Sequence, residues 1–290
     1  MDIADFATQT LNGLQYAMLL FLLAVGLSVV FGLMNFVNLA HGTLYMVGAF
    51  VGFSVATRTG SYWAALAAGP LAAALLGAAF YFLLLKRMQA AGPMKQVLVT
   101  FGLIFVGIDA VRWIWGEDSQ SILAPSALGE SVSFLGLVYP AYRVFIIALG
   151  LAVALLLHLG LERTRLGAVV RAGVDDPVTA ASLGINVDLA FFAVFCLGCA
   201  LAGLGGVVAA PVLQVYPGMD VAILIPTLIV VVVGGPGRLS GAFWGALLIG
   251  MADTFGKVMI PDFSGFMIYA VMALVLLLRP SGLLAARHGS

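Results

Sequence analysis

The sequence predicts an all-α protein, a bundle of helices that cross a membrane. Three observations predict it: 63% of the 290 residues are hydrophobic, only 9% are charged, and the mean hydropathy is +1.14. A soluble domain carries about a quarter charged residues, so this chain has too little charge to cover a surface that faces water. Disorder is excluded as well, because it needs low hydrophobicity and a high net charge.

The charges balance, with 13 basic and 13 acidic residues. Nucleic-acid binding depends on an excess of basic residues that neutralise phosphates. We therefore expect no nucleic acid among the partners, and we expect the lipid bilayer to be the surrounding medium.

The N-terminal segment begins Met1-Asp2 and has a second acid at Asp5. A secretory signal would instead begin with positive charge and end in a small-residue cleavage site. We therefore expect the first apolar segment to be retained as a membrane span.

Apolar segments long enough to be spans follow one another along the whole chain. About 20 apolar residues cross a bilayer core of about 30 Å. The candidate spans are residues 11–33, 39–57, 63–85, 96–115, 140–160, 188–210, 221–235, 242–260 and 264–279. The seventh is short and has Pro217, Pro226 and Pro236 in or beside it, which suggests a broken or re-entrant helix. We expect a single membrane domain over residues 1–290 with about 8–9 membrane segments.

Basic residues in the connecting loops predict the orientation, because cytoplasmic loops are enriched in Lys and Arg. One set of alternate loops and ends holds Lys86, Arg87, Lys95, Arg163, Arg165, Arg171, Arg238, Arg279 and Arg287. The other set holds Arg58, Arg112, Arg143 and Lys257. The first set is therefore expected to be cytoplasmic, with the N-terminus outside and the C-terminus inside.

Glycine is abundant, at 35 residues, and several glycines recur at helical spacing. Gly48 and Gly52 are four apart, as are Gly241 and Gly245. Small residues at this spacing let helix backbones approach closely in lipid. The pattern predicts a tightly packed bundle.

Motifs for catalysis, metals and nucleotides are absent from the sequence. The glycine-rich run at residues 234–241 lacks the Lys and the spacing of a phosphate-binding loop. Cys196 and Cys199 lie in an apolar segment, where free cysteine behaves as a small hydrophobe. The three histidines are far apart in the sequence: His41, His158 and His288. We expect no catalytic site, no metal and no cofactor bound by this chain.

Two acid–base pairs lie within or near the spans. Asp109 and Arg112 are three residues apart, and Asp253 and Lys257 are four apart, so each pair shares a helix face. Charges in a membrane can mark an ion or proton relay. They can also compensate one another locally, and the helical spacing of both pairs favours this second interpretation.

A polar stretch joins the first two spans, and it contains Asn35, Asn38, His41 and Gly42. Polar residues and irregular backbone at membrane depth are tolerated where protein or a water-filled cavity surrounds them. Such breaks often line solute paths. A capped turn between two helices explains the same residues equally well.

A long connection at residues 161–187 is the largest loop on the expected cytoplasmic side. Asp176 followed by Pro177 is a good helix start, and Gly184 is a good end, which predicts a short helix over residues 178–183. Small and apolar residues occur in it where a solvated loop would carry charge. This composition favours a docking surface, and packing on the base of the bundle is the alternative.

This connection resembles the coupling loop of bacterial ABC-importer permeases, and the whole chain is similar to the LivH-type branch of the branched-chain amino acid permease family. The motifs that carry the resemblance lie, in family order, at residues 12–14, 32–36, 38–42, 171–172, 181–186, 234–237 and 279–283. They extend over nearly the whole chain. Each motif alone is weak, but their order and spacing together are specific.

The resemblance implies a permease subunit of an importer in the bacterial inner membrane. Its partners would be a second homologous permease, two cytoplasmic ATPase subunits that use ATP, and a periplasmic substrate-binding protein. The substrates would be branched-chain amino acids, and relatives of this type also serve urea, short amides or aromatic acids. A proton-coupled secondary transporter that uses Asp109 or Asp253 is the alternative from another class.

The resemblance also places functional residues by position. The outer loop at residues 116–139 would receive the binding protein. Residues near the translocation path would be Asn35, Asn38, His41 and Gly42. Residues that dock and couple an ATPase would be Arg171, Asp175, Asp176, Ala180, Ala181, Gly184, Ile185 and Asn186.

Overall fold

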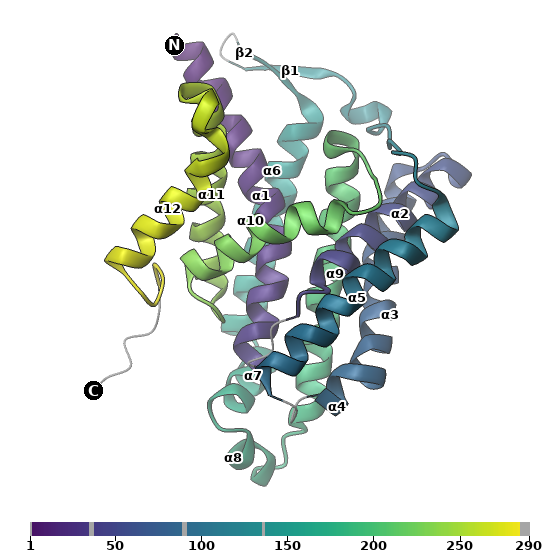
Figure 1. Cartoon of the computed structure of the whole chain (residues 1–290), viewed down its shortest axis with the longest axis vertical. Coiled ribbons are helices and arrows are strands. Elements are labelled where there is room, and N and C mark those ends of the chain that lie inside the picture. The colour runs from purple at the N-terminus through teal and green to yellow at the C-terminus, as the bar shows by residue number, and fades with distance from the viewer. Residues whose placement is uncertain (1, 35–37, 89–91, 135–136, 285–290) are drawn as a thin grey trace.

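The computed structural model describes residues 2–34, 38–88, 92–134 and 137–284 (Figure 1). Helices dominate these residues, as the sequence predicts. The long helices are α1 (Ile3–Met34), α2 (His41–Thr59), α3 (Tyr62–Phe80), α5 (Pro93–Trp115), α6 (Ala141–Arg163), α9 (Val187–Leu213), α10 (Met219–Gly234), α11 (Leu239–Met259) and α12 (Ser264–Leu278). Each of the nine apolar segments expected from the sequence coincides with one of them.

The remaining elements are short. They are η1 (Tyr81–Leu85) and α4 (Lys86–Met88), which continue α3; η2 (Ser126–Leu128); β1 (Ser131–Phe134) and β2 (Leu137–Pro140); α7 (Arg165–Asp175) and α8 (Pro177–Ser182); and η3 (Pro261–Phe263). The two strands pair antiparallel, with Val132 opposite Tyr139. This small hairpin was not anticipated in a chain expected to be all helical.

Within the described residues, six helical stretches are long and apolar enough to cross a membrane. They are Ile3–Gly32, Tyr62–Met88, Met94–Trp115, Ala141–Leu161, Val187–Leu213 and Pro261–Leu278. α10 is apolar but has only 16 residues, as its flanking prolines suggested. α2 and α11 are not among these six helices, because their glycine and polar residues lower the mean hydropathy of the helix. The chain is thus a multi-pass membrane protein.

The centre of the bundle is formed by α1, α9 and α11, with α2 and α3 packed on α9. Glycine makes this packing possible: a Cβ on Gly206 of α9 would lie 2.1 Å from the carbonyl oxygen of Tyr45 on α2. A Cβ on Gly48 would likewise lie 2.4 Å from Cα of Gly203. The backbones therefore touch, which is the close approach that the spacing of small residues predicts.

α10 lies across the other helices rather than along them (Figure 1). It begins after Gly218 and ends at Gly235, both of which adopt a positive φ (98° and 93°) that glycine tolerates readily. The C-terminal segment is bound beside this end, where the Leu283 amide donates to the Val233 carbonyl at 2.8 Å. The glycine-rich run thus acts as a helix break, as expected.

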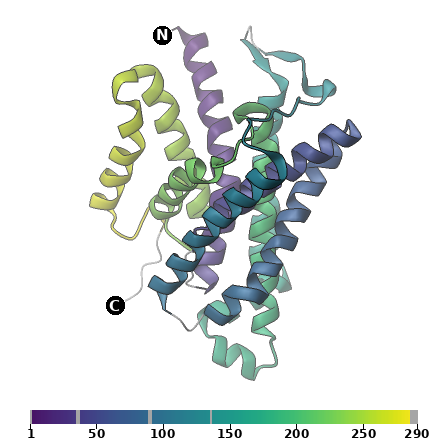
Figure 2. The same ribbon diagram turned by 45° about the vertical axis from the view of Figure 1, so that its right-hand side comes forward.

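The molecule has two distinct ends, which Figures 1 and 2 show at opposite extremes of the long axis. The hairpin end holds the N-terminal turn of α1 and the β1–β2 hairpin. A short bridge between Gln120 and Val215, with amide–carbonyl distances of 2.7 and 2.8 Å, fastens the preceding loop there. The α8 end holds α7 and α8, so the connection at residues 161–187 lies far from residues 116–134 and 137–139.

Candidate functional site

A cavity of about 450 Å³ opens between α1, α2, α10 and α11 near the hairpin end. Its wall is polar for a membrane protein, although Ile223 and other apolar side chains also line it. The polar residues on the wall include Gln9, Asn12, Gln15, Tyr16, Asp253 and Lys257. Polar groups at such positions usually face a bundle interior or a solute path.

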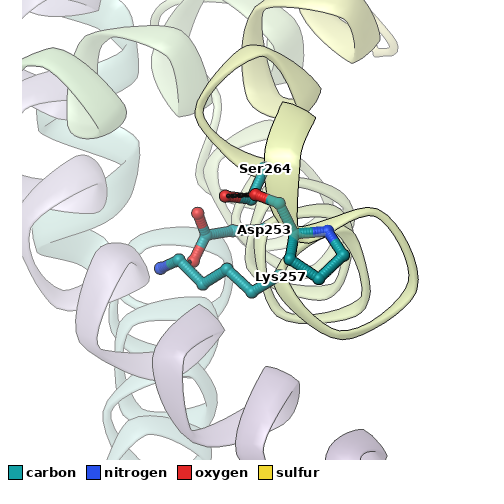
Figure 3. A network of polar contacts seen from close by, with 4 residues as sticks. Asp253, Lys257 and Ser264 are labelled. Carbon is teal, nitrogen blue, oxygen red and sulfur yellow. Dashed lines mark hydrogen bonds and ion pairs between the residues drawn. The ribbon is translucent and has the colours of Figure 1, made fainter.

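Asp253 and Lys257 form a salt bridge in this wall, with 2.5 Å between Lys257 Nζ and Asp253 Oδ2. The Asp253 side chain is 13% exposed and that of Lys257 is 60% exposed. Figure 3 shows the lysine folded back along α11 toward the carboxylate, and Ser264 of α12, whose hydroxyl donates to the Pro261 carbonyl. The ammonium also lies 5.6 Å from the ring centroid of Tyr16, within cation–π range. The cavity therefore presents both signs of charge.

Asn12 ties the cavity to the hairpin end. Its Oδ1 accepts hydrogen bonds from Arg143 Nη1 at 2.7 Å and from the Tyr139 hydroxyl at 3.0 Å. Its Nδ2 donates to Gln9 Oε1 at 3.2 Å. Arg143 lies in the first turn of α6 and Tyr139 belongs to β2, so the Asn12 side chain joins α1, α6 and β2 beside the cavity.

The predicted path residues lie deeper in the bundle. Asn38 and His41 are 2% and 1% exposed, and His41 Nε2 lies 3.2 Å from the Leu23 carbonyl oxygen. Gly42 packs on α10, where a Cβ would lie 2.8 Å from the Asp220 carbonyl oxygen. Asn35 lies outside the described residues. None of Asn38, His41 and Gly42 lines the cavity described above, and their role in a path stays a prediction.

A buried hydrogen bond joins α2 and α10 beside these residues. The Thr43 hydroxyl donates to Asp220 Oδ2 at 3.2 Å, and Asp220 is 1% exposed. Buried polar groups are normally paired, because an unpaired one is costly. This contact fixes the start of α10 against the start of α2.

The α8 end contains the predicted short helix, over Pro177–Ser182 with Asp176 as its N-cap. Asp176 Oδ1 accepts from the amides of Val178 and Thr179, both at 3.0 Å, and the Thr179 hydroxyl donates to Oδ2. The hydrogen bonds from Thr179, first from its hydroxyl, lower the pKa of this carboxyl below its ordinary value of 3.8. The cap is thus held in its ionised form at neutral pH.

The other predicted coupling residues surround this helix. Arg171 is exposed on α7 and donates to the Leu161 carbonyl, and Asp175 ends α7. Ala180 is buried at 3%, whereas Ala181 is exposed and Ile185 half-buried. Two further residues shape the loop: Gly184 has φ +83° and ends the helix, and Asn186 caps α9 through the Leu189 amide at 3.0 Å. Their role in coupling is not tested by these contacts and stays a prediction.

α7 was not foreseen by the sequence reasoning. Apolar residues recur on it at helical spacing, and Val170 is buried while Arg171 is exposed, which is the signal that would have found it. The cavity was missed for another reason. Its wall joins segments that are far apart in the sequence, and Gln9, Asn12 and Tyr16 on α1 form a polar stripe only when the helix is built.

Both acid–base pairs form the ion pairs that their spacing predicts. Asp109 and Arg112 lie 3.5 Å apart on α5, with side chains 77% and 48% exposed, outside the cavity wall. Asp253 and Lys257 compensate one another as well, but they do so inside the cavity. In the part of the chain that is described, no three His, Cys, Asp or Glu side chains gather to hold a metal ion.

Comparison with known proteins gives matches along nearly the whole chain. The sequence profile of the branched-chain amino acid transport system permease component matches residues 9–276. The chain is 28% identical to the high-affinity branched-chain amino acid transport system permease protein BraD of Pseudomonas aeruginosa, over 98% of this chain and 97% of that protein.

Two further relatives from other organisms are also named for branched-chain amino acid transport. LivH of Escherichia coli K12, a high-affinity branched-chain amino acid transport system permease protein, is 27% identical over 96% of this chain and 95% of its own length. A probable branched-chain amino acid transport permease protein LivH of Methanocaldococcus jannaschii is 25% identical over 92% and 89%. No solved structure matches the chain significantly.

The profile and these relatives match the same chain over nearly its whole length. The chain belongs to the family of permease components of branched-chain amino acid transport systems.

Proposed function

We propose that this chain is one of two permease subunits of a bacterial ABC importer and moves branched-chain amino acids across the inner membrane. The observation that carries the proposal is the family match over residues 9–276, together with relatives that are named for branched-chain amino acid transport. The other subunits are a homologous second permease, two cytoplasmic ATPases and a periplasmic substrate-binding protein. ATP hydrolysis belongs to the ATPases, and this chain acts as a single permease domain.

The N-terminus lies outside and the C-terminus in the cytoplasm. This orientation puts the hairpin end in the periplasm and the α8 end in the cytoplasm. The excess of Lys and Arg in the loops of the α8 side supports it, because such residues are retained on the cytoplasmic side. Eight helices then cross the bilayer fully, and the short, transverse α10 together with the glycine-rich break after it makes the ninth passage, because Gly237 packs on Gly32 near the end of α1.

The coupling element consists of α7 and α8 together. Val178 on α8 and Leu183 directly after it are 75% and 77% exposed, and α8 lies at the end of the molecule farthest from the hairpin (Figure 1). Exposed apolar side chains outside the bilayer favour contact with a protein partner. In the proposed orientation, this partner is a groove on a cytoplasmic ATPase subunit. Asp176 and Gly184 fix the two ends of α8 so that motion of the ATPase moves α7 and α9.

The binding protein docks on the hairpin end, over the loop at residues 116–139. Docking and ATP binding switch the permease pair, and the solute passes through the membrane domain that the pair forms. The polar contacts of Asn12 with Tyr139 and Arg143 support a link from the hairpin to the cavity wall. Gly42 packs on α10, and Asn38, His41 and Gly42 shape the inner part of this path.

Reconstitution tests this function. Proteoliposomes that contain the permease pair and the ATPases should take up labelled leucine only with the binding protein outside and ATP inside. Uptake without ATP, or uptake that a proton gradient drives, would make the chain a secondary transporter. Labelled urea, acetamide and benzoate serve as competing cargoes, and ATP-driven uptake of one of them without leucine would reassign the substrate.

Cysteine labelling tests the orientation. Cys196 and Cys199 are first replaced by Ala, and Ser133→Cys on β1 is compared with Ser182→Cys on α8. A membrane-impermeant maleimide should label S133C in intact spheroplasts and S182C only after permeabilisation. The reverse pattern would invert the topology.

A further inference from the structure

The two ion pairs of the chain have the same chemistry but different surroundings. Asp109 and Arg112 are largely exposed on α5, away from any wall of the cavity between α1 and α11. Asp253 is instead 13% exposed, and the open side of its pair is the cavity. A buried carboxylate is costly, and local compensation alone would be served as well by two neutral residues. The placement of this pair therefore indicates that a ligand binds to it in the cavity.

Lys257 and Asp253 both retain bonding capacity beyond their mutual contact. A lysine ammonium has three donors, and the contact with Asp253 Oδ2 uses one of them. An ionised carboxylate has several lone-pair sites, of which this contact occupies one. The Tyr16 ring at 5.6 Å holds the ammonium from the side of α1. A ligand that carries both charges could bind the two groups without separating them.

The remainder of the cavity wall fits a small apolar tail. Ile223, Ala222 and Met219 of α10 and Leu213 of α9 line it together with the charged pair of α11. The amides of Gln9 and Asn12 border the polar half. A volume of about 450 Å³ accommodates one small molecule rather than a peptide.

We propose that this cavity is a transit site for a zwitterionic α-amino acid, in which Lys257 binds the α-carboxylate and Asp253 binds the α-ammonium. The apolar side chain of the amino acid faces α10. This inference rests on the proposed function, because it takes the transported class to be amino acids and adds the residues that recognise the common head group.

The persistence of the Asp253–Lys257 contact keeps such binding weak. When the ligand leaves, the two residues still satisfy one another, so neither charge is left buried without a partner. Conduction needs a site that is favourable enough to enter and weak enough to leave. Asp253 and Lys257, which already pair with each other, meet both requirements better than an isolated charge would.

The test compares single and double neutral variants in the complete reconstituted transporter. Asp253→Asn and Lys257→Gln should each lower leucine uptake about tenfold or more, the effect expected for losing one hydrogen bond to a charged group. ATP hydrolysis stimulated by the loaded binding protein should stay within about twofold of the unsubstituted complex. The double variant D253N/K257Q should remain as defective as the single variants.

Local compensation predicts a different pattern. If the pair only neutralises itself, D253N/K257Q restores uptake to the unsubstituted level, and that result would overturn the proposal. The matched control is D109N/R112Q on α5, which removes an equivalent helical pair and should leave uptake unchanged. A complex that lacks ATP-driven uptake before any substitution would instead overturn the proposed function itself.

Two conservative variants keep the test decisive if the neutral ones do not assemble. Asp253→Glu and Lys257→Arg preserve both charges and shift them within the cavity. Each should assemble at the normal level, as measured by recovery of the complex with the ATPases, and should lower uptake severalfold. Unchanged uptake in both conservative variants would exclude a positional role for the pair.

Discussion

α9 and α12 are both apolar enough to span a membrane, yet they occupy opposite environments. In the most apolar stretch of α9, 61% of the residues are buried inside the protein, whereas in that of α12 none is. A hydropathy profile does not separate them, because lipid tails and a protein interior are equally apolar. What differs is the glycine content and its contacts.

Glycines on α9 meet other backbones, and the glycine of α12 does not. Gly198, Gly203 and Gly206 each have atoms of another helix within 3.1 Å of where a Cβ would be, whereas Gly265 has none within 4 Å. Removing side chains lets helices approach until dispersion contacts accumulate. The comparison teaches that in this chain glycine contacts, rather than hydropathy, mark the helices that form the centre.

The largest expected effect would come from enlarging a central glycine. Gly206→Leu should prevent the α2–α9 packing, because a Cβ there already lies 2.1 Å from the Tyr45 carbonyl oxygen. Overpacking of this kind costs at least about 1–3 kcal/mol and can prevent folding altogether. The amount of detergent-soluble, monodisperse protein measures it.

Gly102→Leu on α5 is the matched control. No atom lies within 4 Å of a Cβ there, so this variant should accumulate normally. Equal recovery of the two variants would contradict the role assigned to the glycine contacts.

A second experiment compares an apolar residue exposed at the α8 end with an apolar residue exposed on a membrane-spanning helix. Leu183 and Leu277 are 77% and 81% exposed, but the first follows α8 and the second belongs to α12. Leu183→Ala should weaken association with the ATPase subunits about tenfold, because a central apolar anchor is lost. Leu277→Ala should leave that association unchanged.

Co-purification over a series of ATPase concentrations measures both variants. If L183A retained full affinity, the α8 end would not be the docking surface.

The smallest expected effect is a pH dependence confined to α8. The pKa of Asp176 is lowered in the folded state, chiefly by the hydrogen bond from the Thr179 hydroxyl. The capping contribution is therefore complete above the ordinary carboxyl pKa of 3.8 and is lost as the pH falls from there through the lowered value. Hydrogen exchange at the Val178 and Thr179 amides, corrected for the intrinsic rate, should accelerate a few-fold below about pH 4.

Asp176→Asn provides the control for this effect. Asparagine caps a helix about as well as aspartate and does not titrate, so the acceleration should disappear. Persistence of the acceleration in D176N would assign it to another group.

Several local features could be predicted from residues near one another in the sequence. Asp176, Pro177 and Gly184 set the limits of α8, because capping and positive φ depend on neighbours within a few residues. The prolines around α10 likewise predicted a short helix. The β1–β2 hairpin and α7 were missed, although the spacing of apolar residues on α7 carried the information.

The candidate site could be predicted only in part. The spacing of Asp253 and Lys257 predicted their ion pair, but it gave no indication that the pair faces Tyr16 across a cavity. Likewise His41 was polar and at membrane depth, yet the fold buries it against Leu23 instead of in that wall. These outcomes depend on helix rotation, which near-uniform apolar composition leaves undetermined.

The sequence by itself determined the membrane environment, the positions of the apolar segments, the limits of α8 and the family, because each follows from composition, from neighbouring residues or from the order of motifs. The tertiary structure decided which helices form the centre, where the polar stripe of α1 meets the charged pair of α11, and which apolar residues remain exposed at the α8 end. The physical reason is that a bilayer makes every helix apolar, so close backbone contacts at glycine and a few paired polar groups select one arrangement among many.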